Sequence, residues 1–312
     1  MDIIVKIVES GGYGRYLIEY DDDPIKFYNE GLSIRNSIGI LDNRTIREFY
    51  DEALDELKEL IDIKTVLEYS NRALEYYNTF EYEKALHYIN LALNQDNNNA
   101  YYWRLKANII ANGGNEKESL KYYDKSLSIE YNKFTCEDKA SVLYELSIKC
   151  LEESSQYRDG MNKINEAMGL IIRAIDTLPK ESEVQLNSYN SFKNSINFYR
   201  ECEIKNLEIL KYNKEELFTI TGTEYQENVK LTSNMPLKLV KESENKFDSD
   251  AIAIFAGYRQ IGYVANSKHT KSDLTSSASQ LQDKFQKVLS GEYLGEFVRY
   301  HQIPFHVGRI LK

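Results

Sequence analysis

The sequence predicts a multidomain α+β protein, in which an α-helical solenoid is followed by a small barrel-like, β-rich domain. Two observations predict this class. Small and aromatic residues recur at a fixed period in the middle of the chain, and short alternating apolar segments replace them towards the end. A small α+β element precedes both. We expect domain boundaries at 1–63, 64–212 and 216–312.

The composition is that of a globular protein, with 42% hydrophobic and 28% charged residues among 312. The formal net charge of −10 argues against attraction of the whole chain to nucleic acid or to anionic membranes. The charge is uneven, because residues 218–312 hold 12 Lys and Arg against 10 Asp and Glu, while residues 1–217 hold 27 against 39. Any part that binds a polyanion is therefore expected in the last third.

The cysteines and the N-terminus suggest a cytoplasmic protein. Cys136, Cys150 and Cys202 are widely spaced and form no C-x-x-C pair, which predicts buried, reduced thiols rather than disulfides or a zinc site. The first residues have no basic segment followed by an apolar one, so they do not resemble a signal peptide. No apolar run approaches the ~20 residues of a membrane span. We expect no cofactor and no membrane contact.

The leading element, residues 1–63, is predicted to form a β-hairpin followed by a helix. Residues 2–8 and 16–20 are apolar and β-prone, and the glycine-rich segment 10–14 between them reads as the hairpin loop. A phosphate-binding loop would instead be followed by a helix and would end in Gly-Lys-Ser/Thr. A helical pattern begins after residue 45. We identify no chemistry in this element.

The middle of the chain is helical and carries an internal repeat. Small residues at fixed positions let two antiparallel helices approach closely, and aromatic residues and leucines fill the space between neighbouring pairs. The pairs, each 34 residues apart, are Tyr69 and Trp103, Ala73 and Ala107, Ala85 and Ser119, Leu86 and Leu120, Tyr88 and Tyr122, Ala92 and Ser126, and Leu93 and Leu127. This pattern resembles the tetratricopeptide (TPR) repeat, which implies helix–turn–helix units with a groove that docks a protein or peptide.

The third unit of the repeat is irregular. Leu146 fits the middle of its first helix, Ala167 and Ala174 fit its second helix, and the spacing implies about eight inserted residues near 152–159. A further helix over 184–210 is expected to cap the stack.

The groove of the array offers two candidate partner-binding residues. Arg104 and Asn108 occupy positions of the second unit that contact ligands in the TPR family, but Ser70 and Leu74 stand at the equivalent positions of the first unit. A clamp for a peptide carboxylate is therefore not predicted, and another extended peptide or helix remains possible. We interpret the many tyrosines of the array as inter-helix packing rather than as platforms for stacked bases.

The last domain is predicted to contain about five strands and one helix. Residues 257–260 read as a hairpin turn, and Ser272 and Asp273 read as the cap of a helix that continues through Leu289 and ends at Gly291. The expected strands cover residues 218–222, 237–240, 251–255, 261–264 and 305–310. This content suggests a small barrel.

A motif in this domain resembles a known family. From Leu237 to Tyr263 the chain reads Leu-x-Leu-x-x-Glu-x-x-Asn-x-Phe-Asp-x-x-Ala-Ile-x-Ile and then Ile-Gly-Tyr. This order is similar to that of the HIRAN domain, and the resemblance covers about 90 residues of the chain. The resemblance implies an OB-like fold that binds single-stranded DNA at a free 3′ end, where aromatic rings stack on the terminal bases and an aspartate accepts from the 3′-hydroxyl.

The resemblance also implies a set of nucleic-acid-binding residues. Asp248 would accept from the hydroxyl, Phe247 would stack, and Asn245 would shape their loop. Tyr225 would be a second ring and Tyr263 would flank the pocket. The candidate set is Tyr225, Asn245, Lys246, Phe247, Asp248 and Tyr263.

Three departures from the family pattern keep the alternatives open. Glu224 stands where DNA-binding members carry a basic residue, Lys246 replaces the usual proline, and Tyr263 stands where a histidine can occur. An acidic residue there loses a phosphate contact and adds repulsion. Asp248 is equally explained as a turn-forming residue, and we do not expect it to form a metal site with Asp250.

We therefore predict a non-catalytic adaptor whose C-terminal domain binds a single-stranded DNA 3′ end while the repeats dock a protein partner. The alternative is a protein–protein scaffold whose barrel does not bind DNA. A third possibility is a catalytic function within residues 1–63. A cluster of lysines around Tyr225, Phe247 and Tyr263 would favour the first hypothesis, and a ring of carboxylates would favour the second.

Overall fold

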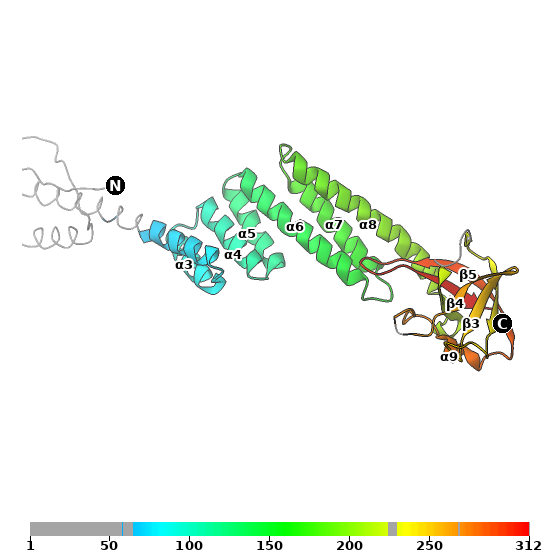
Figure 1. Ribbon diagram of the computed structural model, residues 1–312. Coiled ribbons are helices and arrows are strands. Elements are labelled where there is room, and N and C mark those ends of the chain that lie inside the picture. The colour runs from blue at the N-terminus through cyan, green and yellow to red at the C-terminus, as the bar shows by residue number, and fades with distance from the viewer. Residues whose placement is uncertain (1–57, 59–64, 224–229, 268, 312) are drawn as a thin grey trace, which may run out of the picture. The chain divides into compact units, whose positions relative to one another are not determined.

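The computed structural model describes Lys58 and residues 65–223, 230–267 and 269–311 (Figure 1). The hairpin and helix predicted for residues 1–63 lie outside the described residues, apart from Lys58. The chain forms two compact units, Met1–Asp138 and Lys139–Lys312. The division falls inside helix α6 (Lys133–Ser154) rather than near residues 212–216, where the sequence pattern changes.

The described part of the first unit consists of antiparallel helices joined by tight turns. Residues 65–78 are helical and are followed by α3 (Tyr82–Gln95), α4 (Ala100–Asn112) and α5 (Glu116–Ile129). Asn99 caps α4, because its side-chain oxygen accepts from the backbone N–H groups of Tyr101 and Tyr102.

The small residues of the repeat lie where the helices meet, as predicted. All six are fully buried, and because their side chains are short, neighbouring helix backbones can approach one another. They are Ala73, Ala85, Ala92, Ala107, Ser119 and Ser126. The serine among them at position 126 also donates to the carbonyl oxygen of Ala100 (2.8 Å), which ties α5 to the start of α4. The 34-residue period therefore identifies real packing positions.

The second unit begins with the rest of α6 and continues with α7 (Met161–Thr177) and α8 (Glu183–Ile209). Ala167 and Ala174 on α7 are fully buried, as predicted for the third unit of the repeat. Tyr144 stacks on Tyr189 with ring centroids 4.5 Å apart, which joins α6 to α8. The helix expected over 184–210 is confirmed by α8.

The rest of the second unit is a closed antiparallel barrel. After a short 3-10 turn, Lys214–Glu216, its strands pair in the order β1-β4-β3-β2-β5-β6, so every strand has two neighbours. The strands are β1 (Leu217–Thr221), β2 (Pro236–Lys241), β3 (Ile252–Ala256), β4 (Arg259–Val264), β5 (Val288–Phe297) and β6 (Phe305–Ile310). Phe218, Leu239, Ile252, Ile254 and Ile261 fill the interior and are fully buried.

The helix predicted to run from Ser272 to Gly291 is wrong. The helical part is α9 (Ala278–Gln282), which is capped by Ser277, and the segment after it is strand β5, a sixth strand. The apolar spacing near the end of that segment fits a strand as well as a helix, and pairing of β5 with both β2 and β6 closes the barrel. Gly291 is needed inside the strand, because an added Cβ would lie 2.8 Å from the carbonyl oxygen of Arg309.

Among the described residues, no helix is both long and apolar enough to cross a membrane. Cys136, Cys150 and Cys202 are free and buried, as predicted.

Candidate binding sites

The two candidate partner-binding residues of the array are already engaged by a carboxylate of the chain itself. Arg104 Nε lies 2.8 Å from Asp138 Oδ2, and Asn108 Nδ2 donates to the same oxygen at 3.2 Å. Arg104 and Asp138 are separated by 34 residues, which is one repeat. Sequence reasoning did not single out Asp138, although its position one period after Arg104 was the available signal.

These contacts extend into a row of polar side chains in the first unit, which we call the polar row: Tyr77, Arg104, Asn108, Asn112 and Asp138. Asn112 Nδ2 donates to the hydroxyl of Tyr77 at 3.0 Å, and burial raises the pKa of Tyr77. The hydroxyl of Tyr123 donates to Asn108 Oδ1 at 2.5 Å. The polar row contains one cation and one anion that neutralise each other, so it offers no free positive charge to a peptide carboxylate.

Exposed apolar side chains occur on the same three helices as the polar row, namely residues 65–78, α4 and α6. Leu67 (54% exposed) and Tyr101 (48%) occupy equivalent positions in successive repeats, and Leu74 (36%) lies two helical turns after Leu67 on the same helix face. Phe134 is 56% exposed, and the guanidinium of Arg104 lies 5.4 Å from the centre of its ring. We call Leu67, Leu74, Tyr101 and Phe134 the docking face.

A separate pocket of about 350 Å³ lies between α3, α4 and α5. Lys106 lines it, and its Nζ lies 5.4 Å from the ring of Trp103 and 4.6 Å from the ring of Tyr122. Burial lowers the pKa of Lys106, and the nearby charge of Lys121 lowers it further. The two rings stack on each other at 6.0 Å, so these aromatic residues pack between helices, as the repeat phase predicted.

In the barrel, Asn245 organises the loop between β2 and β3. Its Oδ1 accepts from the backbone N–H groups of Phe247 (3.0 Å) and Asp248 (3.2 Å), and its Nδ2 donates to Glu242 Oε2 (2.9 Å). The hydroxyl of Tyr263 also donates to Glu242 Oε2, at 3.3 Å. Glu242 therefore connects Tyr263 to the loop, a role that the sequence did not reveal.

Asp248 is held in place through both of its carboxylate oxygens. Oδ1 accepts from the backbone N–H of Asp250 (2.9 Å), the contact expected of a turn-forming residue. Oδ2 accepts from Asn266 Nδ2 at 3.0 Å. On α9, the hydroxyl of Ser279 donates to Asp250 Oδ2 at 2.6 Å and its backbone N–H donates to Asn266 Oδ1 at 3.2 Å, so the loop is tied to the helix. The Asp248 carboxylate is thus fixed beside an exposed surface.

The aromatic candidates differ in their placement. The ring of Phe247 is 99% exposed and next to the fixed carboxylate of Asp248, whereas Tyr263 is half-buried. Tyr225 lies outside the described residues. Lys246 is exposed in the same loop, so the structure brings Asn245, Lys246, Phe247, Asp248 and Tyr263 together.

The charge around this loop is mainly negative. Glu242, Asp248 and Asp250 hold their carboxylates within its hydrogen-bond network. Lys241 turns away from it, because its Nζ donates to the carbonyl oxygen of Gln282 and lies 4.9 Å from the ring of Phe285. The described part of the loop therefore has the arrangement that favours a protein scaffold over a DNA site. No group of three or more potential metal-ligating side chains occurs among the described residues.

Comparisons with known proteins do not assign a family. No family model and no curated protein matches the chain. Among solved structures, the type III secretion translocator chaperone SycD of Yersinia enterocolitica is 13% identical over 44% of this chain and 87% of that chain, with a TM-score of 0.32. A second structure of SycD, in complex with a peptide of the translocator YopD, is 14% identical over 43% of this chain and 94% of that chain, with a TM-score of 0.31. These scores are too low to support a fold or a partner, so we infer function from the chain's own geometry.

Proposed function

We propose that the protein is a non-catalytic adaptor whose helical repeats dock a polypeptide partner on the docking face. The observation that carries this proposal is the presence of four exposed apolar side chains on the same three helices that carry the neutral polar row. Exposed apolar side chains that gather on one surface, bordered by polar groups, mark interaction sites.

The chemistry of the docking face indicates the kind of partner that fits it. Leu67, Leu74, Tyr101 and Phe134 bind through apolar area, which contributes roughly 25 cal/mol per Å² removed from water. Arg104 and Asp138 satisfy each other, so neither sign of charge on the partner is favoured at that point. An extended or helical segment with apolar side chains at its centre therefore fits this face, with its polar side chains left in solvent.

Site-specific photo-crosslinking in cells that express the full chain tests the proposal. A crosslinking amino acid at position 67 or 101 is expected to capture one defined polypeptide. The same group at Lys117, an exposed position on α5, is the control. Equal capture from positions 101 and 117, or none from either position on the docking face, would contradict docking at this face.

A second candidate function is binding of a single-stranded DNA 3′ end by the barrel. The observation that favours it is the fully exposed ring of Phe247 beside the fixed carboxylate of Asp248, which matches the roles implied by the HIRAN resemblance. An exposed aromatic face can stack on a base and gain ~1–3 kcal/mol whatever the sequence. The surrounding carboxylates oppose phosphate binding, so this function is expected only for a chain end that offers a hydrogen-bond donor.

Fluorescence anisotropy with the full chain distinguishes the two candidates. Short single strands that end in a 3′-hydroxyl are compared with 3′-phosphate strands and blunt duplex over a salt series. Tyr258→Ala is a matched control for Phe247→Ala, because both rings are fully exposed and Tyr258 lies in the hairpin at the other end of β3. Binding of the 3′-hydroxyl strand that is lost in Phe247→Ala and Asp248→Ala, but kept in Tyr258→Ala, would establish the DNA function. No binding at low salt would exclude it.

A further inference from the structure

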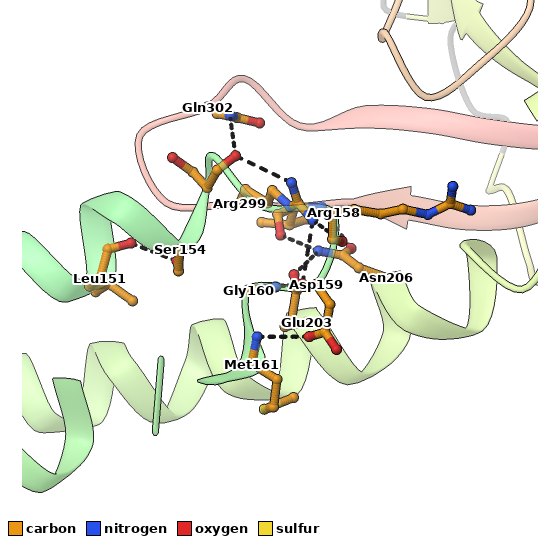
Figure 2. Close-up of polar contacts among 12 residues, drawn as sticks. Leu151, Ser154, Arg158, Asp159, Gly160, Met161, Glu203, Asn206, Arg299 and Gln302 are labelled. Atoms are coloured by element: carbon orange, nitrogen blue, oxygen red, sulfur yellow. Dashed lines mark hydrogen bonds and ion pairs between the residues drawn. The ribbon is translucent and has the colours of Figure 1, made fainter. Parts of the chain in front are cut away.

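The loop between β5 and β6, residues 298–304, reaches the helices of the second unit (Figure 2). Arg299 donates from Nη1 to the carbonyl oxygen of Ser155 (3.2 Å) and from Nη2 to the carbonyl oxygen of Arg158 (2.6 Å). Gln302 Nε2 donates to the carbonyl oxygen of Ser155 as well (3.3 Å). Helix α6 ends at Ser154, so Arg299 supplies donors and positive charge just beyond its C-terminus, where cations are favoured.

Glu203 on α8 acts on the other side of the same connection. Its Oε1 accepts from the backbone N–H of Gly160 at 2.8 Å, and Gly160 is the residue before the start of α7. The same oxygen lies 3.4 Å from Arg299 Nη2. A carboxylate is favoured at a helix N-terminus, so the Arg299–Glu203 pair places each charge at the helix end that suits it.

This ion pair is strongly buried. The side chain of Arg299 is 8% exposed and that of Glu203 is 3% exposed. A buried charge that loses its partner is left desolvated, so removing one member is far more costly than breaking a pair on the surface.

Asn206, one turn after Glu203 on α8, binds the backbone of the loop with its side chain. Its Nδ2 donates to the carbonyl oxygen of Val298 (2.9 Å), and its Oδ1 accepts from the backbone N–H of Val298 (3.2 Å). It also donates to Glu203 Oε2 at 2.9 Å and is fully buried. Asn206 thus pairs with the loop in the manner of a neighbouring strand.

Further contacts support the connection. Arg158, between α6 and α7, donates to the carbonyl oxygen of Leu210, the residue that caps the end of α8 (3.1 Å). Tyr300 meets Tyr199 of α8 edge to face, with ring centroids 5.1 Å apart. An apolar cluster of Ile209, Leu217, Phe297 and Val307 joins the end of α8 to the barrel strands.

We propose that Arg299, Glu203 and Asn206 form a conformational latch that fixes the orientation of the barrel on α6, α7 and α8. Residues 155–158, between α6 and α7, are the receptor for the barrel loop, because Ser155 and Arg158 supply the carbonyl oxygens that Arg299 and Gln302 bind. The barrel is then no independent module on a linker: the surface around Phe247 is held at a fixed distance from the last helix pair. A ligand on the barrel would therefore be presented in one orientation relative to α7 and α8.

The test uses the full chain with two readouts. Hydrogen–deuterium exchange follows the backbone amides of residues 155–162, and electron-spin distance measurements follow labels introduced at exposed positions by Asn194→Cys on α8 and Tyr258→Cys on the barrel. Arg299→Ala is expected to speed exchange in 155–162 by about tenfold or more, since a charge-assisted buried network is lost. The distance distribution is expected to broaden.

Two further variants separate charge from geometry. Arg299→Lys keeps the charge but not the planar fork that reaches two carbonyls and a carboxylate, so it is expected to behave like Arg299→Ala. Glu203→Gln keeps an acceptor for the Gly160 N–H and is expected to fold, with a smaller increase in exchange.

Lys163→Ala is the matched control. Lys163 bridges α6 and α7 through Glu153 (2.7 Å) and Glu166 (3.2 Å) without touching the barrel, and its loss is expected to leave the distance distribution unchanged. An unbroadened distribution in Arg299→Ala would overturn the proposal even if exchange were faster, because apolar contacts alone would then hold the barrel. Equal broadening in Lys163→Ala would overturn it too.

Discussion

Removing the Asp138 carboxylate is expected to destabilise the first unit by an amount that follows from its contacts. Asp138→Ala deletes one oxygen that accepts from both Arg104 and Asn108. The two side chains of the ion pair are 25% and 30% exposed, so the pair lies between an exposed pair, worth up to about 1 kcal/mol, and a buried pair, whose disruption costs about 3–5 kcal/mol. We assign it about 1.5 kcal/mol. The Asn108 bond adds about 1 kcal/mol, for a loss of about 2–3 kcal/mol.

Urea unfolding of the full chain, followed by far-ultraviolet circular dichroism, measures this loss. The relevant unfolding transition is the one whose midpoint differs between the variant and the wild type. Asp138→Asn retains an acceptor oxygen and is expected to lose about half as much free energy of unfolding. A double-mutant cycle with Arg104→Ala isolates the pair, and we expect a coupling energy of about 1 kcal/mol. A coupling energy below about 0.3 kcal/mol would refute the reasoning that the polar row is self-satisfied through Asp138.

Three other predictions concern the barrel and the helices. Gly308→Ala is expected to destabilise the barrel by about 1–3 kcal/mol or to prevent its folding, since the new Cβ would meet the buried ring of Phe218. Gly169→Ala on α7 is expected to stabilise the chain by about 0.5–1 kcal/mol, because nothing lies within 4 Å of the added Cβ. Thermal unfolding compares the two variants. Burial raises the pKa of Cys150 to about 11, so only about a thousandth of its thiol is ionised at pH 8. Alkylation of Cys150 in the folded chain should therefore be slow at pH 8 and should accelerate as the pH approaches 11. Rapid alkylation at pH 8 would contradict this placement. Phe247→Ala should leave the melting temperature of the chain unchanged, since its ring makes no buried contact, and a lowered melting temperature would show that the ring packs.

The local parts of the fold were accessible from the sequence because their signals are local. The 34-residue recurrence of small residues such as Ala73 and Ala107 marks helix contacts directly, and both are fully buried. Alternating apolar residues identified five of the six strands. The start of strand β5 was misread as helix because Leu281, Phe285 and Val288 fit a helical face, and pairing with distant strands decided the outcome.

The long-range contacts of the sites were not accessible in the same way. Arg299 meets Ser155 across 144 positions of sequence, and Asn206 meets Val298 across 92, so no spacing rule connects them. Within the barrel loop, the resemblance pointed to Asn245 and Asp248, and the structure places both in one network. It did not point to Glu242, whose role depends on where the Tyr263 hydroxyl lies after folding.

The central claim is that the docking face binds a polypeptide, and the most direct measurement is calorimetric titration of the crosslinked partner segment into the full chain and two variants. Tyr101→Ala removes a ring of the docking face, and Tyr131→Ala removes an exposed tyrosine (71%) that lies beyond the end of α5 and is not one of the four residues of that face. The account predicts about tenfold weaker binding for Tyr101→Ala and wild-type affinity for Tyr131→Ala. Unchanged affinity for Tyr101→Ala, or equal losses in the two variants, would contradict it.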